Sequence, residues 1–110
     1  MRHRSWRLGL YGDAEELAWA GRVVEQAAAS RGARIVERTV LPARPEDYGY
    51  LVEQWAWEHP GEDPGRRQVV ELYVRLRCSL RVWRAVRKAA LRGLCPEGDG
   101  PHVCRVPWSA

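Results

Sequence analysis

The sequence feature that most constrains the fold is a helix start at Asp13, which lies directly after a strand-like segment. Asp13 is a favourable N-cap residue, and Glu16 three positions later completes a capping-box pattern. The preceding segment, Trp6 to Tyr11, is mostly apolar and typical of a short buried strand. The chain is therefore expected to pass from a strand into a helix through the turn at Gly12.

The predicted helix continues to about Arg31, and Gly32 stands where a C-terminal stop belongs. Residues 34–41 are rich in β-branched side chains and predict a second strand. Strand, helix and strand within residues 6–41 have the size of a βαβ unit, whose crossover connection makes the two strands parallel. The inward stripe of the helix is expected to consist of Leu17, Ala20, Val23, Val24, Ala27 and Ala28.

Two further helices are predicted downstream of this unit. Residues 46–58 favour a short helix, weakened by Gly49, and residues 59–65 form a breaker loop that contains two prolines. Residues 66–93 have apolar positions at helical spacing and predict one long helix of roughly 40 Å.

The C-terminal tail, residues 95–110, is rich in glycine and proline and holds one short run, His102 to Val106, that could add a third strand. At 110 residues the chain is expected to form a single domain, 1–110. The predicted class is α+β or α/β, with an N-terminal βαβ unit followed by a short helix and a long basic amphipathic helix packed on the sheet.

The stretch from Leu72 to Leu94 carries seven positive side chains and no carboxylate. Five of these cations recur at steps of three and four residues, which on a helix places them within about 80° of arc as one basic ridge. Exposed helices usually mix charge signs, so this is the surface for which the sequence predicts an acidic partner. The five residues are Arg77, Arg81, Arg84, Lys88 and Arg92.

Charge is divided unevenly along the chain, whose net charge is +4. Residues 1–71 hold 10 basic and 12 acidic side chains (net −2), and residues 72–110 hold 8 basic and 2 acidic ones (net +6). An acidic segment, residues 46–63, contains six carboxylates and no Lys or Arg. It could neutralise the basic ridge within the chain, and nucleic acid and an acidic protein are the other candidates for that role.

A second, smaller apolar strip is predicted on the long helix, on the far side of the basic ridge. One sheet covers only one face of a helix, so this strip needs another cover, either elsewhere in the chain or in the second subunit of a homodimer. Trp57 and Trp19 are the aromatic side chains expected to be partly exposed, and each is a candidate interface anchor. The strip consists of Val74, Cys78, Val82, Ala85 and Ala89.

The leading functional hypothesis is a non-enzymatic binding protein whose basic ridge engages an acidic partner, most specifically nucleic acid. Arg suits this role because its guanidinium can hold a phosphate with two hydrogen bonds. The sequence contains no zinc-finger spacing and no ribonucleoprotein aromatic signature. The alternative hypothesis is an oligomeric interaction or adaptor protein in which the long helix forms the interface.

Other classes of site have little support in the sequence. No nucleophile, base and orienting group can be identified from the spacing, so no catalytic residue is assigned. Cys95, His102 and Cys104 lack an obvious fourth ligand for zinc, so no metal or other cofactor is predicted, and a Cys95–Cys104 disulfide is left open. No apolar run is long enough to span a membrane and no signal peptide is recognised, so the expected location is cytoplasmic.

Overall fold

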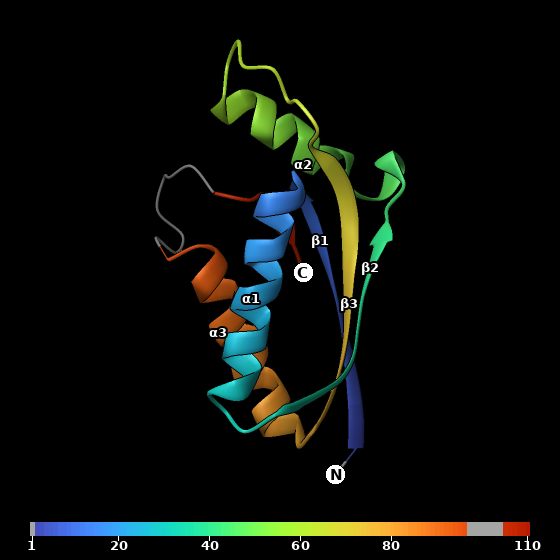
Figure 1. Cartoon of the computed structure of the whole chain (residues 1–110), viewed down its shortest axis with the longest axis vertical. Coiled ribbons are helices and arrows are strands. Elements are labelled where there is room, and N and C mark those ends of the chain that lie inside the picture. The colour runs from blue at the N-terminus through green and yellow to red at the C-terminus, as the bar shows by residue number, and fades with distance from the viewer. Residues whose placement is uncertain (1, 97–104) are drawn as a thin grey trace.

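The structure, a computed structural model, describes residues 2–96 and 105–110. Its four strands form one sheet in the order β2-β3-β1-β4, and each neighbouring pair is antiparallel. Together with three helices they make a small α+β fold within the described residues (Figure 1). The elements are β1 (Arg2–Gly12), α1 (Ala14–Ala29), β2 (Arg34–Pro42), α2 (Pro45–Glu58), β3 (Gln68–Cys78), α3 (Leu80–Leu94) and β4 (Trp108–Ser109).

Strand β3 separates the two strands of the predicted N-terminal unit. β1 and β2 are both antiparallel to β3, so they run parallel to each other, but they are not neighbours. Leu72 of β3 lies opposite Leu8 on one side and opposite Val40 on the other. The element order β1, α1, β2 therefore belongs to a split βαβ arrangement of the ferredoxin-like type, and not to a unit with adjacent parallel strands.

The prediction of one long helix over residues 66–93 is wrong. Its first half is β3, in which alternate side chains are buried, and this period of two is that of a strand. Ser79 ends the strand and caps α3, with its Oγ accepting a hydrogen bond from the Val82 backbone N–H at 3.2 Å. The buried positions of β3 are Val70, Leu72, Val74, Leu76 and Cys78.

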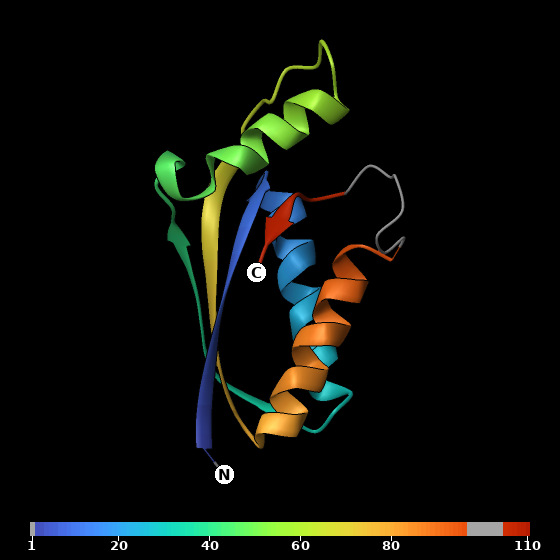
Figure 2. The ribbon, with the colours of Figure 1, turned by 180° about the vertical axis from the view of Figure 1, so that it is seen from behind.

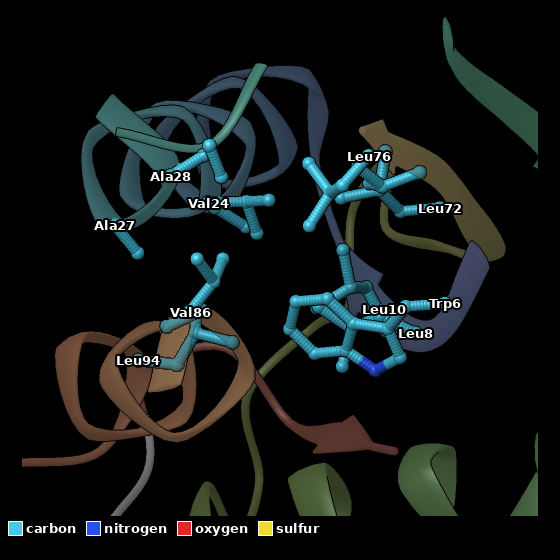
Figure 3. Close-up of a cluster of buried hydrophobic side chains, with 14 of the residues drawn as sticks. Trp6, Leu8, Leu10, Val24, Ala27, Ala28, Leu72, Leu76, Val86 and Leu94 are labelled. Carbon is cyan, nitrogen blue, oxygen red and sulfur yellow. The ribbon is translucent and has the colours of Figure 1, made fainter. Parts of the chain in front are cut away.

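Helices α1 and α3 pack side by side and cover one face of the sheet (Figures 1 and 2). The capping box that begins α1 is confirmed: Asp13 accepts from the Glu16 backbone N–H at 2.8 Å, and Glu16 accepts from the Asp13 backbone N–H at 2.9 Å. Figure 3 shows Val24 of α1 and Val86 of α3 pointing toward the apolar side chains of β1 and β3. The main core therefore lies between the two helices and the sheet.

Helix α2 packs at one end of the opposite face of the sheet, and one of its residues, Tyr48, has non-helical backbone angles. Its Leu51 and Trp55 form a second buried cluster with Tyr11 of β1. The Tyr48 ring lies against Gly9, where a Cβ atom would be only 2.4 Å from the ring, so the strand needs glycine at this position. Burial, together with a 2.8 Å hydrogen bond from the Tyr48 hydroxyl to Glu71, raises the pKa of Tyr48 to about 12.

The C-terminal strand β4 has two residues and pairs with Gly9 and Leu10 of β1. Of the run predicted as a third strand, residues 102–104 lie outside the described residues, and residues 105–106 are not in a strand. In the described part of the chain, no helix is both long and apolar enough to cross a membrane.

Candidate nucleic-acid interface

Helix α3 places four of the five predicted cations on one exposed face. Its opposite face is fixed by Val86, Ala90 and Leu94, which are buried against α1 and the sheet. At 100° per residue, the four exposed cations fall within about 80° of arc and span about 16 Å along the helix axis. We call this set the α3 ridge: Arg81, Arg84, Lys88 and Arg92.

The α3 ridge has no acidic partner among the described residues. α3 contains no carboxylate, and the ion pairs of the described chain all use other arginines. Arg87, the fifth cation of the helix, turns away and lies 5.9 Å from the centre of the Trp83 ring. The four ridge charges are therefore exposed, and the described side chains leave them uncompensated.

The position of Arg81 opposes the helix dipole. Arg81 lies in the first turn of α3, where the partial positive charge of the helix end disfavours a cation. The first turns of α1 and α2 carry carboxylates instead, Glu15 with Glu16 and Glu46 with Asp47. The charge of Arg81 therefore interacts unfavourably with the helix dipole.

The acidic segment 46–63 does not neutralise the ridge within the chain. α2 contacts β1, β3 and β4, whereas α3 packs mainly against α1 on the other face of the sheet. Figure 2 shows α2 across one end of the sheet and α3 along its side. No ion pair in the described residues joins the two helices.

Arg77, the fifth predicted member, does not belong to the ridge. It lies near the end of β3, opposite His3 of β1 and Arg34 of β2 in the register. It is exposed, and its side chain alternates with the buried Leu76 and Cys78, so it projects from the outer face of the sheet. Arg77 precedes Arg81 by four residues, which matches the spacing of a helix. However, Arg77 belongs to β3 and Arg81 to α3, so their side chains do not lie on one helix face.

The predicted second apolar strip is not a continuous surface. Val74 and Cys78 belong to β3 and are buried in the core, 1% and 2% exposed. Val82 and Ala89 of α3 pack partly against the same core, and Ala85 is half-buried beside the ridge. Burial raises the pKa of the Cys78 thiol, which therefore stays protonated at neutral pH and is not a reactive nucleophile.

The two tryptophans proposed as interface anchors differ. Trp19 is half-buried against the core, and the guanidinium of Arg105 lies 4.2 Å from the centre of its ring. Trp57 is 85% exposed on α2. Of the two, Trp57 alone is available as an anchor in the described structure.

Two arginines that the sequence interpretation did not single out combine an aromatic ring with a carboxylate. Arg67 lies 4.6 Å from the centre of the Trp55 ring and forms an ion pair with Glu16, with 3.2 Å between Nε and Oε1. Arg7 lies 5.7 Å from the Tyr73 ring and pairs with Glu71 at 3.4 Å. The partners come from distant parts of the chain, so no local sequence pattern could have identified these contacts.

The described residues contain no metal-binding cluster of three or more His, Cys, Asp or Glu side chains. Of the predicted zinc candidates, His102 and Cys104 lie outside the described residues, and Cys95 is buried at the end of α3. A Cys95–Cys104 disulfide falls outside the described residues for the same reason.

Comparisons with known proteins assign no family to the chain. No protein-family model matches it, and no curated protein matches it significantly.

Proposed function

We propose that this protein binds nucleic acid through phosphate contacts made by the α3 ridge. The observation that carries the proposal is the set of four exposed cations on one helix face, with no acidic partner among the described residues. Binding a polyanion releases condensed counterions, which favours association. The uncompensated face of α3 is a surface that can gain from that release.

The spacing of the ridge favours a regular polyanion. Successive ridge residues are separated by about 4–6 Å along the helix axis. One strand of a DNA duplex carries a phosphate for about every 3.4 Å of its axis. Charges of similar density over about 16 Å can meet several phosphates at once, whereas an acidic protein surface seldom repeats so evenly.

The ridge is expected to bind with little sequence preference. In the proposed mode its Arg and Lys side chains contact phosphates, and contacts to phosphates position a protein without reading bases. It contains no Asn or Gln to pair with adenine. The proposed activity is therefore general nucleic-acid binding with strong dependence on salt.

The test is a salt titration of binding to a generic duplex, read by fluorescence anisotropy. Four phosphate contacts give a slope of about −3.6 for log K against log salt, and replacing Arg81, Arg84 and Lys88 by Gln should bring the slope to about −0.9. Circular dichroism should show an unchanged fold, because these side chains are exposed and Gln is a good helix former.

A matched control separates the ridge from net charge. Arg2, Arg22 and Arg44 are exposed, lie outside α3 and have no ion pair among the described residues. Replacing these three by Gln removes the same charge and should leave most of the slope intact. Equal loss of binding in both triple variants would refute a specific role for the ridge, and absence of binding by the native protein would refute the proposal.

A further inference from the structure

The solvent face of α2 carries an aromatic and acidic surface. In it, the Tyr50 hydroxyl donates a hydrogen bond to Ser109, whereas Glu53 and Trp57 have no hydrogen bond or ion pair among the described residues. Tyr50, Glu53 and Trp57 follow one another at steps of three and four residues, so they line one side of the helix. Trp57 is 85% exposed, and Ala56 and Pro60 beside it line a shallow apolar depression. An exposed indole of this kind is a frequent mark of a protein interface.

The chemistry of Glu53 and Trp57 suits a guanidinium. Positions i and i+4 are neighbours on a helix, so the carboxylate of Glu53 stands one turn from the indole of Trp57. Such a pair can hold Arg by an ion pair and by stacking of its flat guanidinium on the ring. The chain uses this combination twice already, for Arg67 on Trp55 with Glu16 and for Arg7 on Tyr73 with Glu71.

The α2 face and the α3 ridge are complementary in charge, because the α2 face carries a carboxylate and no cation, and the α3 ridge carries cations and no carboxylate. No Lys or Arg occurs between Arg44 and Arg66, and Glu53 has no ion pair among the described residues. The ridge consists of cations without described carboxylate partners. The two surfaces lie on different sides of the molecule, so they cannot meet within one chain (Figures 1 and 2).

We propose that the α2 face, centred on Trp57 and Glu53, docks on the α3 ridge of a second copy of this protein. The partner is argued from charge complementarity: an acidic and aromatic helix meets a helix face that bears four cations. The contact joins two different surfaces, so a two-fold arrangement would form it twice in a closed dimer, and any other arrangement would continue into larger assemblies. This inference rests on the exposed ridge and does not require that the ridge binds nucleic acid.

The proposal is tested by complementation between two variants, in the absence of nucleic acid. One variant carries Glu53→Gln and Trp57→Ala, which removes the α2 face and leaves the ridge. The other carries Arg81→Gln, Arg84→Gln and Lys88→Gln, which removes the ridge and leaves the α2 face. All five positions are exposed, so both variants should fold, as circular dichroism would verify.

Sedimentation velocity at about 50 mM salt, where screening is weak, supplies the readout. The native protein should show a weight-average mass above the 12.6 kDa of one chain, rising with protein concentration and falling toward that value when salt is raised. Each variant alone should remain monomeric. An equimolar mixture of the two should form a one-to-one complex, because each supplies the surface that the other has lost.

Three results would overturn the proposal: a native protein that stays monomeric at low salt, a variant that associates as the native protein does, or a mixture that fails to form the complex. Glu15→Gln, an exposed charge change of the same size on α1, is the control and should leave self-association unchanged. The duplex-binding titration is separate. A native protein that binds the duplex but does not self-associate would refute this inference alone, and a native protein that self-associates but does not bind the duplex would refute the proposed function alone.

Discussion

Helices α1 and α3 cover the same face of the sheet and have similar lengths, 16 and 15 residues, yet their outer sides differ. α1 begins with a complete capping box and two carboxylates, and its exposed side carries both Arg22 and Glu25. α3 begins with a single serine cap and a cation, and its exposed side carries four cations and no acid. The inner sides follow the same packing rules, so the difference between the helices is confined to their solvent-exposed sides.

Substitutions in the core should cause the largest loss of stability, and the loss should be similar for α1 and α3. Val24 of α1 and Val86 of α3 are both fully buried in the main core. Replacing either by Ala should lower the free energy of unfolding by about 2 kcal/mol, because two methyl groups are removed and a small cavity remains. Urea denaturation measures both. A loss at Val86 much smaller than that at Val24 would show that α3 is held less firmly than α1.

The contact line between the helices should be sensitive to added volume. A Cβ atom at Gly93 of α3 would lie 2.6 Å from Cγ1 of Val23 in α1. Gly93→Ala should therefore destabilise by about 1 kcal/mol, since overpacking outweighs the gain in helix propensity. Gly49→Ala in α2 is the control, because no atom lies within 4 Å of its added Cβ, and it should stabilise the protein. Stabilisation by both substitutions would contradict the close approach.

The helix caps should differ in strength. Asp13→Ala removes one side of the capping box of α1 and should cost about 1 kcal/mol. Ser79→Ala removes a single hydrogen bond of 3.2 Å at an exposed site and should cost less, about 0.5 kcal/mol. Thermal denaturation followed by circular dichroism ranks the two. The opposite order would mean that the cap of α3 matters more than its geometry suggests.

Reversing the charge of one first-turn residue in each helix should have the smallest effect on stability. The sign of the effect should be opposite in α3 and α1. Arg81→Glu should stabilise α3 by about 0.3–1 kcal/mol at low salt, because a carboxylate suits the helix N-terminus. Glu15→Arg in α1 should destabilise by a similar amount. Arg81→Glu should at the same time weaken duplex binding. A variant that loses both stability and binding would indicate that Arg81 has a structural role.

Local signals predicted the helices and strands in the first half of the fold, but the predicted unit with adjacent parallel strands was wrong, because β3 lies between β1 and β2. The capping box at Asp13 and Glu16 located α1, and the break at residues 59–65 separated α2 from the next element of the chain. The second half was ambiguous because Leu72 and Leu76 satisfy both the helical and the strand period. Full alternation from Val70 to Cys78, with Ser79 as a cap for the next helix, was the signal that distinguishes the two.

The candidate site was predictable to the extent that it is local. Arg81, Arg84, Lys88 and Arg92 all lie on α3, so their helical spacing correctly placed them on one face. Arg77 was assigned to the same helix, but it lies in β3. The relation between the ridge and the acidic segment 46–63 was not predictable. It depends on long-range packing: α2 buries Leu51 and Trp55 with Tyr11, whereas α3 packs mainly against α1 on the other face of the sheet.

The central position of β3 also has a consequence for how the chain acquires its structure during synthesis. β1 and β2 share no hydrogen bonds and meet only through β3, which comes after both of them in the sequence. A nascent chain that has emerged only as far as α2 can form α1, but it has no strand with which to pair either β1 or β2. Sheet formation must therefore wait for residues 68–78 to leave the ribosome, and contacts between such distant segments slow folding.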